Sequence, residues 1–125
     1  MNLLLDTHAL LWWLDDSPTL SEPAREAIGD GTNTVFVSVA ALWEIRIKEA
    51  LGKLVLPDEF EEVVHDQRFL ILDVKARHVH ALKQLPMLHR DPFDRVLITQ
   101  ALTERLTLVT RDPAILRYDL PFLLA

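Results

Sequence analysis

Arg90-Asp91-Pro92-Phe93-Asp94 opens the stretch of sequence that decides the fold, and Leu106-Thr107-Leu108-Val109-Thr110-Arg111-Asp112 closes it. Asp91 before Pro92 predicts the start of a helix. An aspartate caps free backbone N–H groups, and a proline at the first helical position loses no hydrogen bond. The apolar run that follows predicts a helix to about Arg105. Residues 106–109 are typical of a short buried strand that ends in a polar turn.

Outward from this stretch, short apolar runs alternate with helical patterns along the whole chain. Strands are expected at residues 2–5, 34–37 and 69–72, with an edge strand at 120–124. Helices are expected at 9–14, 22–29, 39–51, 58–67, 75–85 and 114–118. Strands that alternate with helices favour a mostly parallel sheet covered on both faces. We therefore expect one α/β domain over residues 1–125, a three-layer α/β/α sandwich with a sheet of four to five strands.

Acidic residues occur at the ends of the predicted strands. Asp6 directly follows the first strand, Asp112 follows the strand at 106–109, and Asp94 lies in the first turn of the helix between them. Strand C-termini and helix N-termini meet at one edge of a parallel sheet, where ligands bind. Each aspartate also has a simpler explanation as a helix cap. The functional interpretation depends on several acids reaching the same edge.

Glu44 is a fourth candidate for this edge, from within the predicted helix 39–51. It is flanked by Trp43 and Ile45, so that the helix could turn it toward the sheet or toward solvent. The spacing does not decide between the two orientations. Considered alone, Glu44 is more simply interpreted as a surface residue.

The composition excludes several kinds of chemistry. The chain has no cysteine, which rules out disulfides, thiolate metal sites and a cysteine nucleophile. Its three glycines form neither a dinucleotide-binding fingerprint nor a phosphate-binding loop. The five histidines are scattered, so a zinc site is not indicated. Neither a signal peptide nor a membrane helix is expected, which favours a soluble, cytoplasmic protein.

Clustered acids suggest a hard cation. Carboxylates without basic partners repel one another, and Mg²⁺ or Mn²⁺ relieves that repulsion because both ions prefer oxygen ligands. Such ions promote phosphodiester hydrolysis. The net charge of −6 does not indicate a nucleic-acid-binding protein. Residues 75–90 nevertheless carry four cationic side chains and no acid, a strip that suits either a phosphate backbone or solvent.

The ordered set Leu5-Asp6-Thr7-His8, Trp43-Glu44, Asp91-Pro92-Phe93-Asp94-Arg95 and Thr110-Arg111-Asp112 resembles the PIN domain family. More narrowly, it resembles the VapC-type toxins of bacterial toxin–antitoxin pairs, over essentially the whole chain. The resemblance implies a Mg²⁺- or Mn²⁺-dependent endoribonuclease. It also implies a homodimer and a cognate antitoxin that blocks the acidic pocket, with RNA as substrate.

Carried over by position, the catalytic and metal-binding acids of the family fall on Asp6, Glu44, Asp94 and Asp112. The resemblance gives Asp6 and Asp94 the role of metal ligands. Asp112 would be a ligand or a water-mediated contact, and Glu44 would orient or deprotonate the attacking water. Asp91 is the alternative to Asp94, and would otherwise cap the helix and touch a bound water.

Thr110 is expected to be a polar neighbour of these acids. Candidates for contacts with the RNA backbone are Arg46, Lys48 and Arg95, with Lys53 a further possibility.

Two other functions fit parts of the pattern. A receiver-like signalling domain would use an aspartate cluster to bind Mg²⁺ and accept a phosphoryl group. It would also need a lysine after a late strand, where this chain has Thr110-Arg111-Asp112. A catalytically silent PIN-like scaffold would act only through a binding partner. Metal-dependent cleavage of RNA distinguishes an enzyme from either alternative.

Overall fold

Strands and helices alternate along the chain in the computed structural model, which describes all residues from 1 to 125. The first half contains β1 (Asn2–Leu5), α1 (Thr7–Leu14), α2 (Glu22–Gly29), β2 (Thr34–Ser38) and α3 (Val39–Ala50). The second half contains α4 (Phe60–Asp66), β3 (Leu70–Leu72), α5 (Ala76–Ala81), η1 (Leu82–Gln84), α6 (Pro92–Glu104), β4 (Thr107–Thr110), η2 (Ile115–Arg117) and β5 (Phe122–Leu124). None of these helices is both long enough and apolar enough to cross a bilayer.

All five strands are parallel and lie in the order β3-β2-β1-β4-β5. The central strand β1 pairs with β2 on one side and β4 on the other, with Leu5 opposite Val37 and Val109. The chain builds outward from β1 to β2 and β3, then returns across the sheet to β4. The direction of winding therefore reverses between β1 and β4, which makes their C-terminal ends the topological switch point of the sheet.

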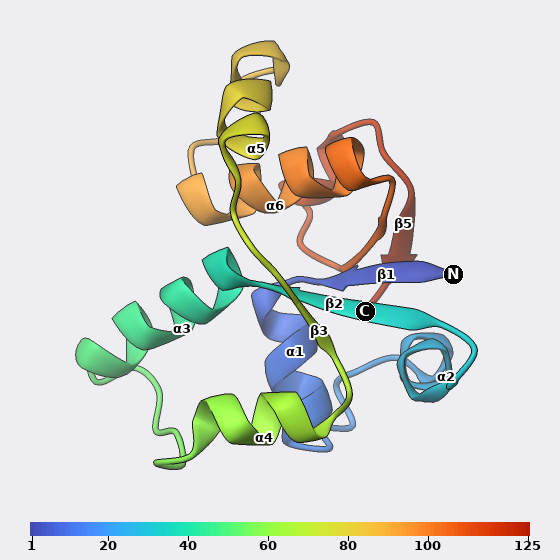
Figure 1. Cartoon of the computed structure of the whole chain (residues 1–125), viewed down its shortest axis with the longest axis vertical. Coiled ribbons are helices and arrows are strands. Elements are labelled where there is room, and N and C mark those ends of the chain that lie inside the picture. Colours follow the sequence, from blue (N-terminus) through green and yellow to red (C-terminus); the bar gives the residue numbers. More distant parts are fainter.

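The two faces of the sheet are covered by different helices. Leu3 and Leu5 of β1 belong to a core that also contains buried residues of α1, α2 and α4. Leu4 points the other way, into a second core with α6 and η2. Figure 1 shows this division, with α5 and α6 on one side of the sheet and α1 and α4 on the other. The predicted α/β/α sandwich with a parallel sheet is confirmed.

Local sequence explains where the helices begin. Side chains of Asp6, Ser21, Ser38 and Asp91 each accept a hydrogen bond from a backbone N–H in the first turn of α1, α2, α3 and α6. These caps agree with the predicted helix starts to within two residues. Strand β4 begins one residue later than predicted, because the Leu106 N–H closes the end of α6 on the Ala101 carbonyl.

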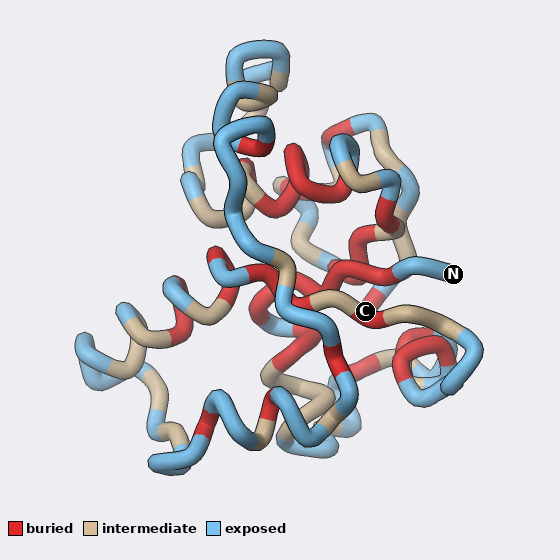
Figure 2. The backbone as a smooth tube through the Cα atoms, in the orientation of Figure 1, coloured by how far each residue is buried: buried red, intermediate tan, exposed pale blue.

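Burial follows position in the sheet. Residues 3–5 of β1 are fully covered, whereas Leu70 and Ile71 of the edge strand β3 are exposed. Figure 2 shows the same contrast along the backbone. The segment from α3 to β3 therefore carries much of the exposed apolar surface, and the acids at the ends of β1 and β4 lie against the covered centre.

Candidate functional site

Asp6 and Asp112 lie on either side of the switch point. The Asp6 N–H donates to the Val109 carbonyl at 3.1 Å, which continues the pairing of β1 with β4 by one residue. Thr110, the last residue of β4, is fully buried between the two acids. Its hydroxyl accepts from the Asp112 N–H at 3.1 Å, and the Thr110 side chain lowers the pKa of Asp6, which places it near that carboxyl group. The sheet itself therefore brings these two acids together.

Asp6 is a buried carboxyl group. One oxygen caps α1 by accepting from the Ala9 N–H at 2.8 Å. Burial raises the pKa of Asp6, and the negative charge of Asp112 raises it further. Hydrogen bonds from Thr110 and Ala9 oppose that rise. Asp6, one of two candidate caps with Thr7, is therefore the cap of α1 and also an acid whose charge has little solvent to stabilise it.

Glu44 points inward from α3 and is buried. Its Oε1 accepts from the Thr7 hydroxyl at 2.6 Å, and its Oε2 lies 3.2 Å from the Lys48 ammonium. The interpretation of Glu44 as a surface glutamate is wrong. The helix instead turns its neighbour Trp43 outward, with 63% of the residue exposed. The bulky apolar residue is outside and the acid inside because α3 lies across the end of the sheet, where Glu44 meets the start of α1.

Asp94 reaches the same edge from the first turn of α6. Its N–H donates to the Asp91 side chain at 3.0 Å, so Asp91 is the helix cap, as predicted. Burial raises the pKa of Asp94 to about 7, and the charges of Asp91, Asp112 and Glu44 raise it as well. A hydrogen bond with His89 acts in the opposite direction. Asp94 is thus close enough to the other acids for its charge to be destabilised by them.

The donor set suits a hard divalent cation. All the candidate ligands are carboxylates, and Mg²⁺ and Mn²⁺ prefer oxygen donors. In this structure no three acidic or histidine side chains surround a common point closely enough to hold an ion. Glu44 is paired with Lys48, and Asp94 contacts His89 at 3.2 Å. The carboxylates would have to move toward a common point to hold an ion. A bound cation would also offset the negative charges that help to raise the pKa of Asp94.

The predicted RNA contacts do not form one basic surface. Arg95 is buried, and its guanidinium donates to the Leu85 and Pro86 carbonyls and to the Tyr118 hydroxyl. Its proposed role in RNA binding is therefore corrected to an internal one. Arg46 forms ion pairs with two glutamates, and Lys48 forms one with Glu44. Neither contact tests binding to RNA, so the role of these two residues in RNA binding stays a prediction.

Two residues that the sequence did not single out lie against the acids. Thr7 donates to Glu44, and His89 contacts Asp94. Thr7 sits next to Asp6, and His89 lies two residues before the cap of α6. Thr7 was part of the motif around Asp6, and proximity to the cap of α6 was the only signal for His89. The sequence could not show their contacts, because these depend on how α1 meets α3 and on the path of the loop before α6.

Known proteins with a similar sequence pattern or structure agree with this fold. A family model for the PIN domain matches residues 3–120. The VapBC2 structure from Rickettsia felis, bound to a DNA fragment from its promoter, aligns with a TM-score of 0.73 at 19% identity, over 98% of each chain. FitAcB from Neisseria gonorrhoeae aligns with a TM-score of 0.64 at 20% identity, over 98% of this chain and 96% of the other.

FitAB bound to an IR36 DNA fragment aligns with a TM-score of 0.63 at 17% identity, over 97% of this chain and 93% of the other. At these identities the likeness is one of fold. A search of curated proteins by sequence found no match.

Proposed function

Because the chain belongs to the PIN domain family, we propose that it is a Mg²⁺- or Mn²⁺-dependent endoribonuclease, built as one domain over residues 1–125. The observation that carries this proposal is the group of acids at the switch point. Asp6 and Asp112 lie at the ends of adjacent strands, and the pKa of Asp94 is raised by both Asp112 and Glu44. Acids whose charged forms destabilise one another suit a site that binds a cation.

The residues have separate roles in this proposal. Asp6 and Asp94 would hold the ion, with Asp112 either a direct ligand or a contact through water. A bound Mg²⁺ or Mn²⁺ would supply positive charge opposite the phosphodiester as negative charge develops on it. Glu44, held by Thr7 and Lys48, would orient the attacking water or accept its proton. Thr110, which accepts from the Asp112 N–H and favours the charged form of Asp6, would keep these two acids in register.

The test is RNA cleavage by purified protein with Mg²⁺, with Mn²⁺ and with EDTA. We expect cleavage only with a divalent cation and its loss in Asp6→Asn. The matched control is Asp58→Asn, which changes an exposed aspartate that makes no side-chain hydrogen bond or ion pair with the four acids. Full activity in purified Asp6→Asn would contradict the assignment. Binding of RNA without cleavage under any of these conditions would favour the catalytically silent scaffold.

A receiver-like function has less support. Arg111 occupies the place where such a domain needs a lysine, and its guanidinium donates to the Ala125 and Thr19 carbonyls. It is therefore engaged away from the acids. Phosphorylation of the protein by a small phosphodonor, with no cleavage of RNA, would favour that alternative.

Toxin activity, an antitoxin partner and a homodimer belong to the same proposal. The structural neighbours from VapBC and FitAB are toxin–antitoxin complexes, which supports an antitoxin that blocks the acids. Expression without the antitoxin should arrest growth by cutting RNA in the cytoplasm. Co-expression with a small gene product from the same operon should restore growth and yield a stable complex.

Apolar surface on α3 supports the dimer. One outward stripe of α3 carries exposed apolar side chains at every fourth position. They are Val39, Trp43, Ile47 and the C-cap residue Leu51. Such stripes usually mark a protein interface. Light scattering should give the mass of two chains for the wild type and of one chain for Ile47→Glu. A wild-type monomer whose Ile47→Glu variant fails to bind the antitoxin would instead assign the stripe to the antitoxin.

A further inference from the structure

A chain of hydrogen bonds leads from Asp94 away from the acidic edge. His89 Nε2 lies 3.2 Å from Asp94 Oδ2, and His89 Nδ1 lies 2.8 Å from the Tyr118 hydroxyl. Arg95 Nη1 donates to the same hydroxyl at 3.0 Å, and the His89 backbone N–H does so at 3.3 Å. Tyr118 and Arg95 are buried, and only 14% of the His89 side chain is exposed. Water therefore has little access to these hydrogen bonds.

The partners of the Tyr118 hydroxyl determine where the hydrogen atoms lie. A phenol has one hydrogen to donate and two lone pairs that accept. The Arg95 guanidinium and the His89 backbone N–H are both obligate donors, so they take the accepting positions. The hydroxyl hydrogen is then left for His89 Nδ1. Since Nδ1 accepts, the neutral imidazole carries its hydrogen on Nε2, the nitrogen that faces Asp94.

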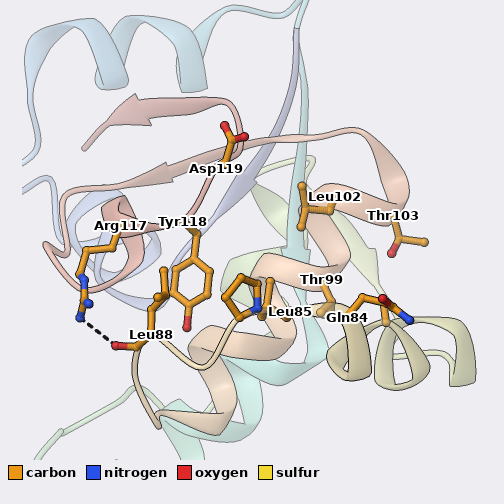
Figure 3. A pocket seen from close by; sticks show the side chains of 11 residues that line it. Gln84, Leu85, Leu88, Thr99, Leu102, Thr103, Arg117, Tyr118 and Asp119 are labelled. Carbon is orange, nitrogen blue, oxygen red and sulfur yellow. Dashed lines mark hydrogen bonds between the residues drawn. The ribbon is translucent and has the colours of Figure 1, made fainter.

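Two contacts hold the loop that carries His89, and a third packs against the imidazole itself. Arg95 also donates to the Pro86 carbonyl at 2.8 Å, which ties α6 to the loop that carries His89. The His89 and Tyr118 rings pack edge to face with their centres 5.3 Å apart. Arg117 donates to the Leu88 carbonyl at 2.8 Å, the bond drawn in Figure 3. That figure also shows Tyr118 beside Leu88, where both line a cavity of about 490 Å³.

The same network joins two of the acids. Tyr118 follows η2, and η2 is preceded by a turn in which Asp112 accepts from the Ala114 N–H at 2.9 Å. His89 lies just before α6, which carries Asp94. The contact between Tyr118 and His89 therefore connects the segment after β4 to the start of α6. Both acids depend on the placement of these two segments.

We propose that His89 is a positioning residue, which donates from Nε2 to Asp94 Oδ2 and so orients that carboxylate, with Tyr118 and Arg95 setting the tautomer. Occupation of Oδ2 by this one bond leaves Oδ1 free for the cation. This inference rests on the proposed function only in naming the cation. His89 does not act as a general base, because its accepting nitrogen is already used by Tyr118.

The tautomer can be tested without any activity measurement. Two-dimensional ¹H–¹⁵N NMR of ¹⁵N-histidine-labelled protein distinguishes the protonated from the accepting ring nitrogen. We expect the hydrogen on Nε2 in the wild type, and a mixture of tautomers in Tyr118→Phe. His78 is an internal reference, because its Nδ1 accepts from the Lys75 N–H at 2.9 Å, which also places the hydrogen on Nε2. A hydrogen on Nδ1 of His89 in the wild type would overturn the proposal.

The effect on the cation is tested by titration calorimetry with Mn²⁺. Loss of a residue that orients a metal ligand weakens binding by about 10- to 100-fold, and we expect this range for His89→Ala. His89→Gln places an amide N–H near the position of Nε2 and should recover most of the affinity. The control is His80→Ala, an exposed histidine on α5. Thermal unfolding in EDTA shows whether each variant is folded.

The outcomes separate the two proposals. Wild-type affinity in folded His89→Ala would overturn the positioning role alone. Equal losses in His89→Gln and His89→Ala would also overturn it, because the donor would then be irrelevant. A wild-type protein that binds no cation would contradict the proposed function together with the orientation of Asp94 toward an ion.

Discussion

Two histidine–carboxyl pairs occur in this molecule at the same separation, and their carboxyl groups have opposite properties. His89 lies 3.2 Å from Asp94 at the acidic edge, and His78 lies 3.2 Å from Glu104 between α5 and α6. The pKa of Glu104 is lowered to about 2, chiefly by hydrogen bonds from Arg77. The pKa of Asp94 is raised to about 7, chiefly by burial and then by the charge of Asp91.

The difference lies in the neighbours. Glu104 has an arginine beside it and is therefore stabilised as an anion, which is what a structural link between two helices requires. Asp94 has only acids and a histidine beside it, so its charge is left without a counterion. A histidine partner alone therefore does not reveal whether a carboxyl group is structural. The absence of a permanent cation beside Asp94 is what favours a functional interpretation.

The largest expected effect separates the two carboxyl groups by activity. Asp94→Asn should lower RNA cleavage by at least about 100-fold, the scale on which catalytic acid–base and metal-binding groups act. Glu104→Gln should leave the rate per folded molecule unchanged. The measurement is the initial rate of cleavage with Mn²⁺, corrected for the folded fraction by circular dichroism. Equal losses in both variants would mean that Asp94 and Glu104 do not differ in their roles.

Binding of a cation should stabilise the fold through Asp94 and not through Glu104. At a Mn²⁺ concentration 100 times its Kd, the wild type should gain about 2.7 kcal/mol in the free energy of unfolding. Glu104→Gln should gain as much as the wild type, whereas Asp94→Asn should gain far less. Urea unfolding with and without Mn²⁺ measures these gains. A full gain in Asp94→Asn would place the ion elsewhere.

The two pairs should also give opposite dependences of stability on pH. Because the folded-state pKa of Asp94 is raised from 3.8 to about 7, the folded protein binds more protons than the unfolded chain between these values. Metal-free protein should therefore lose stability as the pH rises from about 4 to 7. Asp94→Asn removes this loss and should be more stable at pH 8 by about 1–2 kcal/mol. A variant no more stable than wild type at pH 8 would contradict the raised pKa.

The smallest effect concerns the structural pair. The folded-state pKa of Glu104 is lowered from 4.5 to about 2, so its contribution to stability is present above pH 4.5 and is lost as the pH falls toward 2. Arg77→Gln should move that pKa back toward 4.5 and so narrow the pH range over which Glu104 changes the free energy of unfolding. NMR titration of the Glu104 carboxyl measures the shift. An unchanged pKa would mean that His78, not Arg77, dominates this site.

Much of the fold could be predicted from local sequence. Side-chain caps depend on residues three positions apart at most, so Asp6, Ser38 and Asp91 identify helix starts without any tertiary information. The apolar run at residues 3–5 likewise identifies a strand covered on both faces. Asp6 and Asp112 could be expected at one edge because every parallel strand ends on the same side of its sheet.

The sequence by itself therefore determined the elements, their order and the acids that end the central strands. The tertiary structure alone decided which side of each helix is covered. Glu44 is buried and Trp43 exposed because α3 lies across the end of the sheet, and Arg95 is internal because the loop at 85–89 closes over it. The bond between His89 and Tyr118 joins residues 29 positions apart. Local rules set the periodicity of an element, whereas the packing of distant segments sets which of its faces meets water.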